Sequence, residues 1–532
     1  MGKRRNNKAA GARGGYGSLR DMLREDEKAR SGGTSGTGGA GARDASRKKG
    51  RRAGGTAGRA RAGSASDASA NVPAPLTGDA HARIAIIGGG AAGLAAAVAA
   101  ARELGERGLH EAAGVVVFEA DERVGRSILA TGNGRCNFSN SSVDASLYRN
   151  PDFVAGALRA LADDGAARLK ERGLACDPDE DPVLRFFGDI GLVWREEAEG
   201  RLYPATGKAS TVVDVLRAAA SDAGAVEACG RRVVAVEPPA EEGGLFHLRF
   251  ADGSIEHAAA VIMAVGGKHA LCGSDGGDRA GAHAASLLPE RYAVEPPRPV
   301  LGPLRVREEA PRQLDNIRVR VRVRLADDAP FGATKAEERG EMLFRSYGVS
   351  GICIFNLSRF AEPGDALFID FVPQVERAHL RRRLVERARR LAAPKGIARG
   401  SREPLTYETL LRGLLLPQIA RAVLEEAGLD PRAPLDGEDL PALERALAEF
   451  PLTVEGIGDE RQCQVLRGGL AVDAFDPLTM ESRFDAGLFA AGEALDVDAP
   501  CGGYNLHWAW ASGLLAGAAA ARRIADRGAE HE

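Results

Sequence analysis

Three glycines, Gly88, Gly90 and Gly93, follow the apolar stretch Ile84–Ile87 with the spacing G-x-G-x-x-G and precede an alanine-rich segment. In a strand–turn–helix unit the first glycine permits the tight turn, the second lets the backbone approach a pyrophosphate, and the third lets helix and strand pack closely. The start of the following helix offers unpaired N–H groups and a partial positive charge to phosphates. The pattern therefore predicts a dinucleotide-binding turn.

The chain also supplies the acid that accompanies such a turn. A second apolar stretch, Val115–Phe118, ends in Glu119, which lies 26 residues past Gly93. An acid at this place can accept hydrogen bonds from the adenosine ribose; its usual distance is about 20 residues, and the longer spacing leaves room for the crossover helix. Strand, glycines, helix, strand and acid in this order make the prediction far more specific than the glycines alone.

A second group of candidate residues lies near the C-terminus. The apolar stretch Leu488–Ala491 ends in Gly492 and Glu493, which can present the Glu493 carboxylate to the ribityl hydroxyls of a flavin. An ordinary strand end with a solvated acid is the alternative. Gly502 and Gly503 then precede an apolar helix, whose positive end would stabilise negative charge at the N1/O2 edge of a flavin on reduction.

Five further side chains have chemistry that a redox site can use. Cys136 is a candidate redox thiol, with a small buried packing residue as the alternative. Arg135 can face a flavin or substrate carboxyl groups, or form a structural ion pair. His507 lies in the first turn of the terminal helix, where it can donate a proton or be a packed histidine. Tyr504 and His269 are candidate proton donors to a substrate.

The elements that position these residues follow from hydrophobic periodicity. The apolar stretch Ala260–Val265 runs into Gly266 and can return to the sheet beside the nucleotide. Residues 316–324 alternate polar and apolar side chains, which predicts a strand with one solvated face. The proline-rich segment Val294–Pro299 indicates a stiff linker, and residues 352–356 indicate a further strand.

The predicted architecture is an α/β nucleotide-binding domain split by an inserted β domain that carries a helical flap. Residues 375–450 indicate the flap, because Leu, Arg, Ala and Glu recur there at helical spacing. The predicted segments are a disordered basic tail at 1–82, the first part of the nucleotide-binding domain at 83–293, the β domain at 294–374, the flap at 375–450, the return through the β domain at 451–470, and the second part of the nucleotide-binding domain at 471–532.

Charge is distributed unevenly along the 532-residue chain, whose formal net charge is −3. Residues 1–82 hold 17 Lys and Arg against 7 Asp and Glu, whereas the remainder holds 54 against 67. The first segment has almost no large apolar residues, so we expect it to be disordered and to make only weak anionic contacts. The acidic remainder shows no basic patch interleaved with aromatics, so we expect no specific nucleic-acid partner.

Cysteine usage and hydropathy bear on metals, membranes and compartment. The seven cysteines show no C-x-x-C spacing, which argues against zinc, iron–sulfur and thioredoxin-like sites, so no metal site is predicted. We expect reduced thiols in a cytoplasmic protein. No apolar run reaches the roughly 18 uncharged residues that a membrane span needs, so no membrane span is predicted.

Several longer motifs accompany the glycine turn. They are Leu129–Asn137, Gly200–Pro204 with Lys208–Ser210, Tyr347–Gly351, Thr479–Ser482, and Gly492–Glu493 with Gly502–Leu506. Together they resemble the motifs of the BaiN/RdsA-type bacterial flavoproteins, also described as aminoacetone-oxidase-like or NAD(P)/FAD-dependent oxidoreductases. The resemblance covers about residues 83–525, and the Thr-Gly-Asn-Gly-Arg-Cys-Asn run is its most specific part.

The resemblance implies FAD, held by a Rossmann-like domain of the two-dinucleotide-binding-domains type, with an inserted β-barrel and a helical flap over the flavin. It assigns the adenosine diphosphate half to the glycine turn with Glu119 and Arg126, the ribityl chain to Glu493, and the isoalloxazine to segments 131–137 and 502–505. The residues predicted to bind FAD are Gly88, Gly90, Ala91, Ala92, Gly93, Glu119, Arg126, Thr131, Gly132, Asn133, Arg135, Cys136, Asn137, Gly266, Gly492, Glu493, Gly502, Gly503, Tyr504 and Asn505.

The predicted function is that of an FAD-dependent oxidoreductase with a small-molecule substrate. One branch of the family reduces conjugated double bonds in 3-oxo bile acids, so the resemblance favours hydride transfer from reduced flavin to a C=C bond conjugated to a carbonyl. The chain contains one dinucleotide fingerprint, so NAD(P)H is expected only as a transient electron donor. The alternatives are an amine-type flavin oxidase that releases hydrogen peroxide and a flavin-bearing protein that binds or modifies RNA.

Overall fold

The computed structural model describes residues 83–109, 114–175, 177, 180–241, 243–266, 284–327, 332–392 and 405–531. The expected disordered tail at 1–82 and the candidate proton donor His269 lie outside these residues. Within the described part of the chain, no helix is both long enough and apolar enough to cross a membrane.

A five-stranded parallel sheet with the order β19–β10–β1–β2–β6 forms the centre of the described nucleotide-binding region. Strands β1, β2 and β10 are runs of buried apolar residues, as expected for a parallel sheet covered on both faces. The predicted return of residues 260–265 to this sheet is confirmed, because β10 pairs with β1. The strands are β1 (Ile84–Ile87), β2 (Val115–Glu119), β6 (Val226–Cys229), β10 (Ala260–Met263) and β19 (Leu488–Ala490).

Two small antiparallel sheets and several helices complete this region. The sheets are β3–β5–β4 (Ser139–Asn140, Arg201–Pro204, Trp194–Glu196) and β7–β8–β9 (Val233–Glu237, Phe246–Phe250, Ile255–Ala258). The helices are α2 (Ala91–Glu106), α3 (Arg126–Ala130), α4 (Pro151–Glu171), α5 (Pro182–Asp189), α6 (Ala209–Asp222), α8 (Ala284–Leu287) and α15 (Tyr504–His531). Elements from the two ends of the described chain therefore build one nucleotide-binding region.

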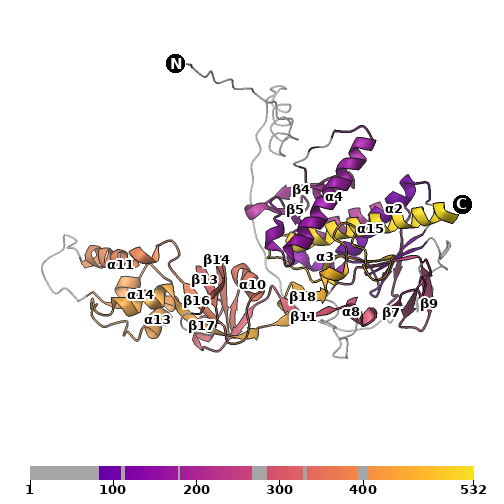
Figure 1. Cartoon of the computed structure of the whole chain (residues 1–532). Helices are drawn as coiled ribbons and strands as arrows, with labels where there is room; N and C mark the ends of the chain where they lie inside the picture. Colours follow the sequence, from indigo (N-terminus) through magenta and orange to yellow (C-terminus); the bar gives the residue numbers. More distant parts are fainter. Residues whose placement is uncertain are drawn as a thin grey trace, which may run out of the picture. The chain divides into compact units, whose positions relative to one another are not determined.

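The long C-terminal helix α15 packs along α2, the helix that follows the glycine turn (Figure 1). A β-carbon on Gly513 would lie 2.4 Å from the carbonyl oxygen of Ala92, and one on Gly517 would lie 2.3 Å from that of Ala96. Residues four apart share a face of a helix, so the two backbones approach closely at two successive turns. This contact fixes the position of α15 relative to the glycine turn.

The inserted region contains a closed barrel with the order β12–β15–β14–β13–β16–β17 among the described residues. The predicted alternation at 316–324 is confirmed, because β13 buries Val321, Val323 and Leu325 and turns the intervening arginines outward. The elements are β12 (Leu304–Val306), α9 (Ala310–Gln313), β13 (Arg318–Ala326), β14 (Thr334–Arg345), β15 (Gly348–Ser350), α10 (Ile352–Ser358), β16 (Ala366–Asp370) and β17 (Phe450–Ile457).

Four helices lie between β16 and β17 in the sequence, inside the segment expected to form the flap. Their buried leucines share one hydrophobic core with the barrel residues, so the four helices pack on the barrel (Figure 1). The helices are α11 (Arg377–Ala392), α12 (Tyr407–Leu411), α13 (Pro417–Glu426) and α14 (Leu440–Ala448).

The prediction of a stiff linker at Val294–Pro299 is wrong. This segment belongs to β11 (Val294–Val300), which pairs antiparallel with β18 (Val465–Leu470). The prolines are tolerated because the register shifts between Glu295 and Arg298, and because β18 is the sole partner of β11 among the described strands.

The prediction of a strand at residues 352–356 is also wrong, because helix α10 begins there. Cys353, Ile354 and Leu357 are buried in the barrel core. A spacing of three to four residues places these side chains on one face of a helix. The short apolar run fits a strand as well as a buried helix, and only the barrel core selects the helix.

We expect Gly517→Ala to lower the melting temperature, because the new methyl group would overlap a backbone oxygen of α2. Overpacking of this kind costs about 1–3 kcal/mol. Gly105→Ala in α2 is the matched control, because no atom lies within 4 Å of its β-carbon position, and it should be neutral or slightly stabilising. Thermal unfolding of both variants beside the parent protein measures the difference, and equal melting temperatures would contradict the close contact.

Candidate functional site

Two of the three fingerprint glycines are required by packing within the protein itself. Gly88 has φ +105°, and a β-carbon there would lie 2.5 Å from the Ala264 carbonyl oxygen just past β10. A β-carbon on Gly93 would lie 1.9 Å from the Gly88 carbonyl oxygen. At Gly90, by contrast, the nearest atom is Ser127 Oγ at 3.2 Å. A β-carbon at Gly90 would therefore meet a side-chain hydroxyl that can shift and no backbone atom, so the stricter need for glycine there would come from a ligand.

The start of α2 is open to an anion. Gly90 is the N-cap residue and supplies no side-chain hydrogen bond to the helix. No hydrogen bond to the amides of Ala91 and Ala92 is formed within the described residues. These N–H groups and the positive end of the helix fit the pyrophosphate of a dinucleotide.

Glu119, at the end of β2, lies directly against the glycine turn. Its carboxylate accepts hydrogen bonds from the N–H of Gly89 at 2.8 Å and of Asp121 at 2.9 Å. Arg126 forms an ion pair with Asp121 at 3.0 Å. A cleft of about 620 Å³ opens here, lined by Ala120, Asp121, Glu122, Arg123, Arg126 and Arg232. The cleft has room for the adenosine half of a dinucleotide.

The segment Thr131–Asn137 has an unusual backbone, with a cluster of left-handed residues. They are Gly132 (φ +56°), Asn133 (φ +55°), Gly134 (φ +80°) and Cys136 (φ +57°). Backbone strain of this kind costs on the order of 1–3 kcal/mol for a residue other than glycine and persists only where the surroundings hold it. Here the Cys136 N–H donates to the Thr131 carbonyl at 3.1 Å and closes the loop. The segment is therefore a shaped loop rather than a passive connection.

The reactive side chains of this loop are held by the protein. Cys136 is fully buried, and burial raises the pKa of its thiol to about 12, so the thiol is neutral at physiological pH. The Arg135 guanidinium lies 4.2 Å from the centre of the Tyr203 ring and pairs with Glu197. The roles assigned to Cys136 and Arg135 toward the flavin stay predictions.

The loop lies beside the glycines that precede α15, although they are far apart in sequence. Gly503 has φ +102°, and a β-carbon there would lie 2.3 Å from the Ser139 carbonyl oxygen and 3.1 Å from Asn137 Oδ1. Asn140 Nδ2 donates to the Gly502 carbonyl at 3.0 Å. Asn137 Oδ1 is buried and accepts no hydrogen bond within the described residues. A buried acceptor without a donor fits a ligand that brings one.

Asn505 and Tyr504 shape the start of α15. The Asn505 amide clamps the preceding loop, because Oδ1 accepts from the Ala499 N–H at 2.9 Å and Nδ2 donates to the Ala499 carbonyl at 2.8 Å. Tyr148 Oη donates to the Tyr504 carbonyl at 2.8 Å. The Tyr504 ring lies against Gly502, since a β-carbon on that glycine would be 2.7 Å from Tyr504 Cε2. Burial raises the pKa of Tyr504.

His507 lies inside the protein, with both ring nitrogens facing protein groups. Nδ1 is 2.9 Å from Ser139 Oγ, and Nε2 is 3.7 Å from a carboxylate oxygen of Asp181. Burial lowers the pKa of His507, and the Asp181 charge opposes that shift. This placement suits a residue that holds the Ser139 segment in position, and a proton-donating role for His507 stays a prediction.

The ends of β10 and β19 bring three further predicted residues to the same edge of the sheet. A β-carbon on Gly266 would lie 3.3 Å from Glu493 Oε2, so the carboxylate lies against the Gly266 backbone. Gly492 has φ +64°, and a β-carbon there would lie 2.9 Å from the Ala92 β-carbon. Glu493 therefore lies at the same carboxyl edge as the glycine turn, where ligands of open α/β sheets bind.

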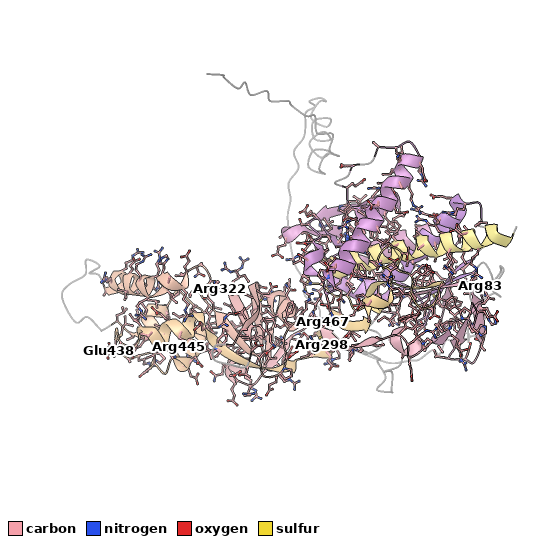
Figure 2. The ribbon with its side chains drawn as sticks, in the orientation of Figure 1. Arg83, Arg298, Arg322, Glu438, Arg445 and Arg467 are labelled. Carbon is pink, nitrogen blue, oxygen red and sulfur yellow. The ribbon has the colours of Figure 1, made fainter. Side chains whose placement is uncertain are left out.

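A buried ion cluster, which the sequence analysis missed, anchors the loop before α15 to the inserted region. Asp498, only 1% exposed, accepts hydrogen bonds from Arg359 Nε at 2.7 Å and from Arg467 Nε and Nη2 at 2.8 and 2.9 Å. Burial by itself would raise the pKa of Asp498, but the two arginines lower it. Figure 2 labels Arg467 on β18, beside Arg298 of β11. The three partners lie far apart in sequence, so no local spacing could reveal them.

The residues of the predicted site thus form two connected groups. The first holds the glycine turn, Glu119, Gly266, Gly492 and Glu493 at the carboxyl edge of the sheet. The second is the contact of segment 131–137 with segment 502–505. In this contact Asn137 Oδ1 is buried and accepts no hydrogen bond within the described residues. The unpaired first-turn amides of α2, the cleft of about 620 Å³ and the glycine-lined surface fit FAD.

Comparison with known proteins agrees with this geometry. The chain matches the family described as HI0933-like protein Rossmann domain over residues 82–519. It is 33% identical to the 3-dehydro-bile acid delta(4,6)-reductase of Clostridium scindens over 454 residues, which is 83% of this chain and 99% of that protein. It is 26% and 27% identical to the ribosomal RNA dihydrouridine synthases of Haemophilus influenzae and Escherichia coli, in each case over 80% of this chain and 95% of the relative.

The match spans the split nucleotide-binding region together with the inserted barrel and helices. The resemblance stated from the motifs is therefore confirmed. The chain belongs to the HI0933-like family of flavoproteins with a Rossmann-type FAD-binding domain, and it is an FAD-dependent oxidoreductase.

Proposed function

We propose that this protein reduces a carbon–carbon double bond conjugated to a carbonyl group. The observation that carries the proposal is the similarity, over nearly the full length of the relative, to a protein named as a bile acid delta(4,6)-reductase. Two more distant relatives are named as dihydrouridine synthases. Dihydrouridine is uridine with hydrogen added across a ring C=C bond conjugated to a carbonyl. Both kinds of relative are therefore named for the same change in the same type of bond.

The residues of this chain would bind and orient the cofactor. FAD supplies the hydride when it is bound and reduced, and the protein contributes position and electrostatics. The first-turn amides of α2 would hold the pyrophosphate in front of Gly90, and Arg126 would line the adenosine site. Glu119 would accept from the ribose, and Glu493 would accept from the ribityl chain.

The start of α15 would stabilise negative charge. Gly502 and Gly503 let the backbone reach the site because neither carries a β-carbon. The helix behind them runs from Tyr504 to His531, so its positive end points toward the preceding loop. A helix terminus so placed favours the charge that develops at the pyrimidine edge of a flavin on reduction.

Addition of hydride to an enone also requires a proton at the α-carbon. Tyr504 is our candidate for this donor, because its ring lies against Gly502 at the start of α15 and carries a hydroxyl proton. Arg135 is our candidate for binding a carboxylate or carbonyl group of the substrate, since a guanidinium presents several N–H donors in one plane. The enclosed position of His507 favours a positioning role.

We further propose NAD(P)H as the electron donor and the cytoplasm as the compartment. The single dinucleotide fingerprint is assigned to FAD, so the nicotinamide nucleotide would bind only transiently. The free thiols of Cys136, Cys229, Cys353, Cys463 and Cys501 support a cytoplasmic location, because thiols persist in a reducing compartment.

A second candidate substrate is RNA, in which a uracil ring would contain the C=C bond that is reduced. Two observations favour it: the similarity to ribosomal RNA dihydrouridine synthases and the 17 Lys and Arg of residues 1–82. The bond chemistry is unchanged in this case, and only the molecule that presents the bond differs.

Anaerobic turnover tests the reaction class. We expect NADH or NADPH to bleach the bound flavin, and a steroid with a 3-oxo-4-ene group, or a uridine-containing RNA, to restore its colour with formation of the saturated product. Absorbance at the flavin band and mass spectrometry of the product follow the two steps. Oxygen consumption with a primary amine, hydrogen peroxide release and no enone reduction would instead identify an amine-type oxidase.

Gly90→Val tests the cofactor site with only a small local demand on the protein's own packing. A β-carbon at position 90 meets the Ser127 hydroxyl at 3.2 Å, and this side-chain atom can shift, so we expect a melting temperature of the apoprotein close to that of the parent. The valine would occupy the space of the pyrophosphate and weaken FAD binding by about tenfold or more, which corresponds to at least ~1.4 kcal/mol. FAD content after purification and FAD titration of the apoprotein measure this, with Gly105→Ala as control. Full FAD retention would contradict the assignment.

A further inference from the structure

Helix α11 carries an unusual concentration of positive charge. Its 16 residues include one glutamate, Glu386, and seven arginines, namely Arg377, Arg381, Arg382, Arg383, Arg387, Arg389 and Arg390. Leu380 and Leu384 face the core that the helix shares with the barrel and are 3% and 2% exposed. The arginines therefore occupy the outward side of a helix that the barrel core holds in place.

The acids around α11 neutralise only some of these charges. Arg377 pairs with Glu449 at 2.9 Å, and Arg381 pairs with Glu444 at 2.9 Å. Each of these arginines thus has a carboxylate of its own. The neighbouring helix α14 supplies one of these acids, and the loop after it supplies the other.

The central arginines have no such compensation. Arg382 and Arg383, each 61% exposed, share the single carboxylate of Glu386 at 3.9 and 3.7 Å. Arg389 and Arg390 are exposed and form no ion pair within the described residues. Four guanidinium groups therefore face solvent with one carboxylate among them.

The four arginines lie in two rows along α11, about 100° apart around the helix axis. Arg382 and Arg389 are seven residues apart, as are Arg383 and Arg390. Seven residues are two helical turns, or about 10.5 Å along the axis, so each pair lies on one side of the helix. A repeating ligand with negative charge at regular intervals can engage both pairs at once.

A cleft of about 140 Å³ lies beside the row formed by Arg383 and Arg390. It is lined by Arg383, Arg387, Arg390, Leu391 and Glu386. Arg387 Nε donates to the Leu410 carbonyl at 2.7 Å, so its guanidinium is fixed at the edge of the cleft. Guanidinium groups at fixed positions match the oxygens of a phosphate group in bidentate fashion.

We propose that this outward face of α11, centred on Arg382, Arg383, Arg389 and Arg390, binds the phosphate backbone of RNA. A lipid surface fits less well, because none of the large apolar residues that are exposed among the described residues belongs to α11, and membrane-surface helices insert such residues. The choice of RNA among polyanions rests on the second candidate function proposed above. It departs from our expectation of no specific nucleic-acid partner, which rested on the acidic net charge of residues 83–532 and on the absence of a basic patch interleaved with aromatics; the basic face of α11 contains no Phe, Tyr or Trp.

The test is RNA binding by the full-length, FAD-loaded protein. A fluorescently labelled, uridine-containing RNA hairpin is titrated at several salt concentrations, and anisotropy is measured. Replacing all four arginines (Arg382→Gln, Arg383→Gln, Arg389→Gln and Arg390→Gln) should weaken binding by about tenfold or more and reduce the slope of log K against log salt by about 3–4.

A second quadruple variant controls for net charge. It replaces four exposed, acid-paired arginines of other elements, namely Arg217, Arg249, Arg312 and Arg318. We expect it to bind RNA within about twofold of the parent. Equal losses in both variants, or unchanged binding in the α11 variant, would overturn the proposal. Preferential binding to anionic phosphatidylserine vesicles, or equal competition by duplex DNA, would also overturn it.

The parent protein and the α11 variant also show whether this proposal and the proposed reaction stand or fail separately. Flavin content and reduction of a small 3-oxo-4-ene steroid should be unchanged in the α11 variant, because none of its four arginines is among the residues assigned to FAD or to the substrate. Loss of RNA binding with intact enone reduction supports the α11 surface. RNA binding by a parent protein that reduces no enone would defeat the proposed reaction and leave the RNA surface standing.

Discussion

The structure depends on the close approach of two helix backbones, α2 and α15. Gly513 and Gly517 of α15 lie over the carbonyl groups of Ala92 and Ala96, where a β-carbon would have no room. The first helix follows the glycine turn, and the second closes the described chain. Because both are rigid elements, their contact sets where the loop before α15 can lie. Gly502, Gly503, Tyr504 and Asn505, at the start of α15, depend on this placement.

Two devices then shape the loop that α15 carries to the site. On one side, Asn505 and Asn140 bond its backbone, and the left-handed segment 131–137 packs against Gly503. On the other side, Asp498 binds Arg359 and Arg467 in a buried cluster. A buried carboxylate with two guanidinium partners is costly to break. The cluster therefore ties the loop before α15 to Arg359 at the end of α10 and to Arg467 on β18.

The reaction of the family and the charge of the surface indicate that two regions of the chain have different functions. The Rossmann-type region and the start of α15 would bind FAD and stabilise charge, as other flavoproteins use protein groups to tune their cofactor. The barrel and its helices form a separate hydrophobic core and present a different surface, on which the arginines of α11 are concentrated. The FAD-binding region would then act on the reducible C=C bond, and the arginines of α11 would bind the rest of the substrate molecule.

The sequence by itself determined what depends on local geometry. The glycine spacing at 88–93, the apolar strands of the sheet and the alternation of β13 follow from backbone sterics and from the period of a helix or strand. What only the tertiary structure decided depends on partners far along the chain. Val294–Pro299 forms a strand because β18 pairs with it, and residues 352–356 form a helix because the barrel core requires it. Likewise, His507 lies between Ser139 and Asp181, and the central arginines of α11 face solvent with a single carboxylate among them. The burial and the ion pairs of a side chain depend on residues far along the chain, which a local sequence pattern does not contain.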